Sequence, residues 1–145
     1  MRWFIWRWAL REAGKSIRAK SARESAAGLS PQSYEAMCRD VLRQYGWDAR
    51  TTAATGDQGA DVVASKLGQA KTTIRLVLQC KLYSNPVGNK AVQEAYAAQA
   101  HFRATYAAVV TNATYTQSAQ SLAATTGVKL LRTGDLHRIN TIFPV

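Results

Sequence analysis

The residues of this sequence with the clearest capacity for chemistry are Asp61, Gln79 and Lys81. Asp61 follows a glycine-rich turn, and Gln79 and Lys81 end a stretch that is otherwise β-branched and apolar. Residues two apart in a strand share a face, so Gln79 and Lys81 project together while Cys80 points into the opposite layer. A carboxylate and an amide oxygen are hard ligands for Mg²⁺, and an adjacent ammonium can offset charge on a phosphate. The three residues predict a cation and phosphate site if the fold brings Asp61 beside Gln79.

Each of these residues has an ordinary structural explanation when it is taken alone. An Asp after a glycine turn usually serves the turn itself. A Gln-x-Lys pair on a strand is usually an exposed polar face. The combination is informative because the polar Gln-Cys-Lys ends the apolar run of residues 74–78, at a strand end that is expected to face outward.

The composition favours a polyanionic partner. The chain has 145 residues, which fits one domain, and its 19 Lys and Arg against 9 Asp and Glu give a net charge of +10. Nucleic acid is the first candidate for such a partner and an anionic membrane surface is the second. Only two cysteines and two histidines are present, without the spacing of a zinc site. We therefore expect free thiols packed in the core and a reducing, cytoplasmic setting.

Residues 1–29 differ in composition from the rest and are expected to form a basic, Trp-rich N-terminal arm. They hold three of the four tryptophans, and seven Lys and Arg against two Glu. The apolar run is too short to span a bilayer, and Arg7 interrupts it. The arm is a candidate for binding DNA phosphates, for an interfacial membrane contact, which is disfavoured, or for a flexible tail without a role.

Residues 30–145 have the pattern of one folded domain. A capping Ser30 before Pro31 begins a helix that Gly46 ends. Periodicity then predicts strands at 47–55, 61–66, 72–81, 106–111 and 128–131, helices at 89–102 and 114–126, and a helical turn at 135–139. The order αβββαβαβ predicts an α/β domain with a central mixed sheet flanked by helices.

Five segments, in order, resemble one family of nucleases. They are GDQGADVVASK, VLQCKLYSNPVG, AVQEAYAAQAHF, VVTNATYTQSAQSLA and GVKLL. Together they closely resemble the catalytic domain of the Mrr-like type IV restriction endonucleases. In this branch of the PD-(D/E)xK superfamily, a glutamine stands at the position of the second acidic residue of the motif. The resemblance runs from about residue 33 to 136. It implies a restriction-endonuclease-like core.

The resemblance also implies roles for individual residues. Asp61 and Gln79 would ligate Mg²⁺, for which Mn²⁺ is a substitute, and the backbone carbonyl of Cys80 would complete the shell. Lys81 would be the catalytic lysine. Glu35 matches an acidic residue on the first helix, close to the metal.

Other matching positions carry less weight. Asp57, in the glycine turn, is expected only to support the site. Gln93 and Glu94 lie on an Ala-rich helix, where such residues are more often solvated. Thr111 and Asn112 would donate hydrogen bonds to phosphate or cap the next helix. The candidate DNA-binding residues are therefore Asp57, Gln93, Thr111 and Asn112.

These expectations amount to a metal-dependent DNA endonuclease of restriction type. Because Gln79 replaces a carboxylate, we expect weak metal binding. Preference for modified or foreign DNA is an association of the family only. The alternatives are a non-catalytic DNA-binding or membrane-tethered module that keeps the fold, and a junction-resolving or repair nuclease. A homodimer is a further expectation, because cutting both strands needs two sites or two visits.

Overall fold

The computed structural model describes residues 28–52 and 61–145 of the chain. Helix α2 (Pro31–Gln44) begins where the sequence predicts, because the Ser30 hydroxyl accepts a hydrogen bond from the Ser33 N–H at 3.1 Å. The helix ends before Gly46, whose positive φ of 89° suits glycine. Nearly all of the predicted N-terminal arm, as residues 1–27, lies outside the described residues.

Five strands form one mixed sheet whose spatial order equals their order in the chain. β1, β2 and β3 pair antiparallel, and β3, β4 and β5 pair parallel. The helix-containing connections thus fall between the parallel strands, as parallel pairing requires. The strands are β1 (Asp48–Thr51), β2 (Val62–Leu67), β3 (Thr73–Lys81), β4 (Tyr106–Thr111) and β5 (Lys129–Arg132).

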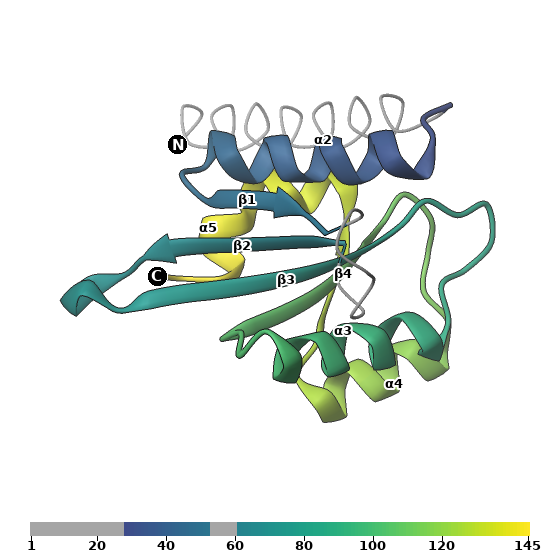
Figure 1. Ribbon diagram of the computed structural model, residues 1–145. Coiled ribbons are helices and arrows are strands. Elements are labelled where there is room, and N and C mark those ends of the chain that lie inside the picture. The colour runs from purple at the N-terminus through teal and green to yellow at the C-terminus, as the bar shows by residue number, and fades with distance from the viewer. Residues whose placement is uncertain (1–27, 53–60) are drawn as a thin grey trace, which may run out of the picture.

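Helices cover both faces of this sheet (Figure 1). α2 packs on one face with the C-terminal segment η2 (Thr133–Arg138) and α5 (Ile139–Ile142), and this core includes Tyr34, Leu78 and Phe143. α3 (Asn89–His101) and α4 (Gln117–Thr126) lie on the other face. Their core is built largely from alanine and valine. The short helix η1 (Gln69–Lys71) lies between β2 and β3.

This architecture confirms the predicted α/β class and the αβββαβαβ order. Boundaries differ by more than one residue at three places. β1 ends at Thr51, α4 begins at Gln117 because Thr116 caps it, and the C-terminal helical turn is longer than predicted. The Thr116 hydroxyl accepts from the Ala119 N–H at 3.1 Å, which explains the later start of α4.

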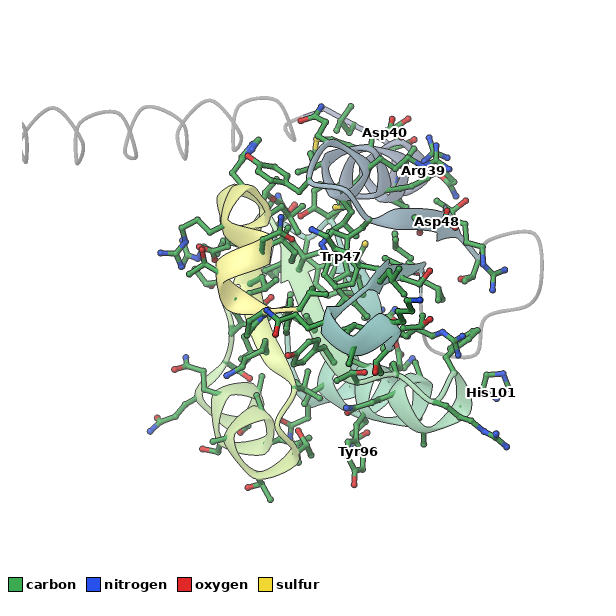
Figure 2. The ribbon with its side chains drawn as sticks, turned by 90° about the vertical axis from the view of Figure 1, so that its left-hand side faces the viewer. Arg39, Asp40, Trp47, Asp48, Tyr96 and His101 are labelled. Carbon is green, nitrogen blue, oxygen red and sulfur yellow. The ribbon has the colours of Figure 1, made fainter. Side chains whose placement is uncertain are left out.

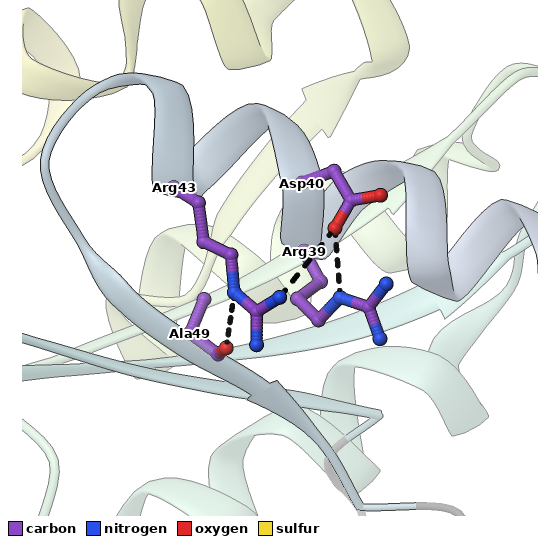
Figure 3. Close-up of polar contacts among 4 residues, drawn as sticks. All are labelled: Arg39, Asp40, Arg43 and Ala49. Carbon is purple, nitrogen blue, oxygen red and sulfur yellow. Dashed lines mark hydrogen bonds and ion pairs between the residues drawn. The ribbon is translucent and has the colours of Figure 1, made fainter.

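Arg43 on α2 ties the helix to the first strand, next to an ion pair within the helix (Figure 3). Arg43 Nε donates to the Ala49 carbonyl of β1 at 2.9 Å, and Arg39 Nε donates to Asp40 Oδ1 at the same distance. That hydrogen bond, with the charges of both arginines, lowers the pKa of Asp40 below its usual value. β1 is therefore anchored from the helix side as well as by its pairing with β2.

Two further expectations can be compared with the described residues. Cys38 and Cys80 are free and buried, as predicted for thiols that pack in the core. Within residues 28–52 and 61–145, every helix is too short or too polar to cross a bilayer.

Candidate active site

Pairing of β2 with β3 brings Asp61 to the end of β3. Val62 lies opposite Leu78, and the Asp61 N–H donates to the Leu78 carbonyl at 2.9 Å. Asp61 Oδ2 then accepts the N–H of Cys80 at 2.7 Å. The carboxylate is held by the backbone between Gln79 and Lys81, so the structure joins the residues that the sequence analysis grouped.

Gln79 is buried at this strand end. Its side chain is 2% exposed, and it follows Val77 on the face that α3 covers. Gln79 Oε1 has no hydrogen-bond partner, and it is the only buried side-chain N or O atom of the described residues in that condition. Leaving a buried acceptor unsatisfied costs roughly 1–3 kcal/mol. This atom is therefore an exception among the buried side-chain atoms of residues 28–52 and 61–145.

Lys81 is paired with a glutamate on α3. Its Nζ lies 3.0 Å from Glu94 Oε2, and the Tyr83 ring centroid lies 6.0 Å from the same atom. Burial alone would lower the pKa of Lys81, but the hydrogen bond and charge of Glu94, with smaller effects from Tyr83 and Asp61, raise it overall. Lys81 is accordingly an ammonium at neutral pH.

Glu35 approaches the same strand end from the opposite side of the sheet. It lies on α2 and is partly buried. The pKa of the Cys80 thiol is raised by its hydrogen bond with Cys38 and by burial, and also by the charges of Asp61 and Glu35. Both carboxylates thus lie within electrostatic range of Cys80, whose backbone contacts Asp61.

The candidate DNA-binding residues of β4 have structural tasks. Thr111 is fully buried, and its hydroxyl accepts from the Ala113 N–H at 3.1 Å. Asn112 Oδ1 accepts from the Tyr83 N–H at 2.8 Å, which joins the segments that follow β3 and β4. These contacts explain both residues through the fold, and a contact with DNA stays a prediction for each.

The other two candidates are placed differently. Gln93 is exposed on α3, next to Glu94, and is free to meet a ligand from solvent. Asp57 lies outside the described residues.

The pairing of Glu94 with Lys81 was not foreseen from sequence. The buried positions of α3 are Ala91, Val92, Ala95 and Ala98. Glu94 falls within this stripe, three residues after Ala91 and four before Ala98, so it faces the sheet. A charged residue in a core-facing position was the signal that would have identified it.

The arrangement suits a hard cation. In the described part of the chain, no three His, Cys, Asp or Glu side chains gather as a metal-binding group. The donors at the end of β3 are oxygen atoms of Asp61 and Gln79. Mg²⁺ commonly takes one or two protein oxygens and keeps several waters, so the unsatisfied Gln79 Oε1 and the Asp61 carboxylate at the same strand end fit the ligand chemistry of that ion.

Solved structures share this fold. MspJI restriction endonuclease, in complex with a 27-mer oligonucleotide, has 18% identity and a TM-score of 0.59 over 85% of this chain and 30% of its own. The DNA modification-dependent restriction endonuclease AspBHI has 20% identity and a TM-score of 0.59 over 90% of this chain and 36% of its own. AF1548, a protein of unknown function, has 23% identity and a TM-score of 0.57 over 71% of this chain and 58% of its own.

The chain spans between 30% and 58% of these proteins, and at such identities the likeness shows the fold alone. A comparison with curated proteins finds no match. The family evidence is broader, because the restriction endonuclease family Mrr_cat matches residues 26–139. That match includes every residue of the site described above. The chain belongs to the Mrr_cat family of restriction endonucleases.

Proposed function

We propose that the chain is a metal-dependent endonuclease that hydrolyses phosphodiester bonds in DNA. The observation that carries this proposal is the buried Gln79 Oε1 without a partner, beside the Asp61 carboxylate and on the same strand as the Lys81 ammonium. Family membership supports the reaction class. The net charge of +10 supports a polyanionic substrate.

Asp61 and Gln79 would hold the ion, with Glu35 nearby on α2. Mg²⁺ is the proposed ion and Mn²⁺ its substitute, since both accept oxygen ligands. When bound, the ion supplies Lewis-acid stabilisation of the phosphate and activation of water. The hydrogen bond from the Cys80 N–H orients Asp61 before any ligand arrives, which is the preorganisation that such a site needs.

Lys81 would act as a cation rather than as a base. Glu94 stabilises its protonated form and fixes the position of Nζ. An ammonium held in this way can donate a hydrogen bond to a phosphate oxygen and stabilise the negative charge of the transition state. Glu94 is thus a positioning residue that acts through Lys81.

The preferred DNA is a narrower part of the proposal. AspBHI is described as DNA modification-dependent, and MspJI as bound to an oligonucleotide. By analogy with these, we propose restriction-type cleavage of modified or foreign DNA. A homodimer would supply the two active sites that cutting both strands requires.

Plasmid nicking with Mg²⁺ or Mn²⁺ tests the proposal. Asp61→Ala and Lys81→Ala should each reduce the rate by about 100-fold or more, because each removes a charge that stabilises the transition state. Asp40→Ala and Lys129→Ala, at solvent-facing positions away from the site, are the matched controls and should stay within about twofold of wild type. Wild type that nicks no faster than Asp61→Ala and Lys81→Ala would refute the nuclease. A parallel comparison of methylated and unmodified plasmids tests the proposed preference for modified DNA.

A further inference from the structure

A polar hollow lies on the sheet, and its Arg50 end is the part nearest to the candidate active site. Its volume is about 230 Å³, and strands β1, β2 and β3 line it together with Phe102 at the end of α3. Its polar side chains are those of Asp48, Arg50, Ser65 and Arg75. In Figure 2 the labelled Asp48 and His101, the last residue of α3, lie on the same side of the molecule. The hollow is where α3 leaves the antiparallel part of the sheet uncovered.

Strand register places the hollow on the same face as the catalytic residues. Arg50 lies opposite Val63, and Val63 lies opposite Val77. Asp61 lies two residues before Val63 and Gln79 lies two residues after Val77, toward the same end of this antiparallel pair, so both share the face of Val63 and Val77. With a rise of about 3.3 Å per residue and about 4.8 Å between strands, the Cα atoms of Arg50 and Asp61 are on the order of 8 Å apart.

Arg50 is the group available to a ligand. Its side chain is exposed and forms no hydrogen bond or ion pair among residues 28–52 and 61–145. The neighbouring Ala49 carbonyl is held by Arg43, which fixes the strand that presents Arg50. Arg75, by contrast, donates to the Phe102 carbonyl at 2.6 Å and so frames the hollow.

The charges favour an anion at the Arg50 end. Arg50 and Arg75 outnumber Asp48, which lies two residues before Arg50 on the same strand face and opposite Ser65. One DNA strand carries a phosphate at every nucleotide, so a separation on the order of 8 Å is short enough for one strand to contact both residues. The geometry points to a phosphate contact: we propose that Arg50 binds a backbone phosphate of the DNA strand, close along that strand to the phosphate held at Asp61 and Gln79.

This inference names a substrate contact of the proposed nuclease and rests on that function, but binding tests it separately from cleavage. The 145-residue chain is titrated into a labelled DNA duplex with EDTA over a series of KCl concentrations, and fluorescence anisotropy is measured. Arg50→Ala should weaken binding about 3- to 10-fold. It should also reduce the slope of log K against log[KCl] by about 1, because one phosphate contact is lost.

Three further variants sharpen the result. Arg50→Lys keeps the charge and should retain most of the slope. Asp48→Asn removes the competing carboxylate and should tighten binding. Lys129→Ala, an equal loss of charge at the opposite edge of the sheet, should bind more tightly than Arg50→Ala.

The inference is overturned if Arg50→Ala binds with the affinity and salt dependence of Lys129→Ala, or if the wild-type chain does not bind the duplex. Arg50-dependent binding by a chain that never nicks plasmid would support the contact while refuting the nuclease.

Discussion

Two buried polar residues of this protein, Gln79 and Thr133, differ in how they are satisfied. Thr133 lies after β5, where its hydroxyl meets the Tyr34 hydroxyl at 2.7 Å and the Thr111 carbonyl at 3.4 Å. These contacts join α2, β4 and η2 within the fold. Gln79 is equally inaccessible, yet its Oε1 has no partner in the described part of the chain.

With the proposed function, the comparison separates a polar group that serves stability from one that would serve a ligand. A satisfied buried network rigidifies the fold around it. An unsatisfied buried acceptor lowers stability and calls for an explanation, such as a bound ion or a catalytic role. The largest tests of this distinction alter Gln79, and smaller ones alter Thr133 and Glu94.

Gln79→Leu should separate activity from stability. The substitution removes the unsatisfied acceptor, so the free energy of unfolding should stay equal to that of wild type or rise, since apolar replacement of an unpaired buried group is not costly. Nicking should fall by about 100-fold or more, because an ion ligand is lost. Denaturant unfolding and the plasmid assay measure the two effects.

Gln79→Glu is the complementary variant. Restoring a carboxylate should tighten Mg²⁺ binding in calorimetry without DNA, where wild type should bind weakly. Tight binding by wild type that Gln79→Glu does not strengthen would contradict the assignment of Gln79 as a ligand.

Thr133→Val should have the opposite pattern. It keeps the shape of the side chain but leaves the buried Tyr34 hydroxyl without its partner. The free energy of unfolding should therefore fall by about 1–3 kcal/mol. Nicking below the melting temperature should be nearly unchanged. Adding Tyr34→Phe should recover part of the loss, because it removes the stranded hydroxyl as well. A Thr133→Val variant that keeps its stability and loses nicking activity would contradict the conclusion that Thr133 serves stability.

Glu94→Gln is expected to destabilise the fold less than Thr133→Val does, by about 1 kcal/mol or less for a partly exposed pair. Glu94 raises the pKa of Lys81 above the usual 10.5, so the pair's contribution is complete below that pH and is lost as pH rises through the raised value. The difference in melting temperature between wild type and Glu94→Gln should therefore shrink at strongly alkaline pH. A difference that grows there would contradict the pairing.

Much of the fold could be predicted because local signals coincide with tertiary ones. The capping Ser30 and Pro31 set the start of α2, and the apolar run at 106–111 matches β4 to the residue. Alternation along β3 also places Gln79 and Lys81 on one face. The end of the chain was harder, because residues 133–142 form two short helical segments whose length is decided by packing on the core.

The contacts of the site were less accessible to sequence reasoning. The ion pair of Lys81 with Glu94 depends on how α3 lies over the sheet, which periodicity does not specify. Arg50 has no motif around it, and its relation to Asp61 follows only from the register of β1 with β2. The roles of Asp61, Gln79 and Lys81 remain predictions that the variants above test, and the role of Glu35 is a prediction as well.

The sheet's strand order, which repeats the order of the chain, has a consequence for folding. Asp61, Gln79 and Lys81 come from two strands joined directly through a short connection, so they meet by closing a local loop at low entropic expense. The reactive groups can thus assemble in an early hairpin, before the parallel strands dock. Truncations that spare β2 and β3 would then lower the stability of the domain while Asp61, Gln79 and Lys81 still lie close together.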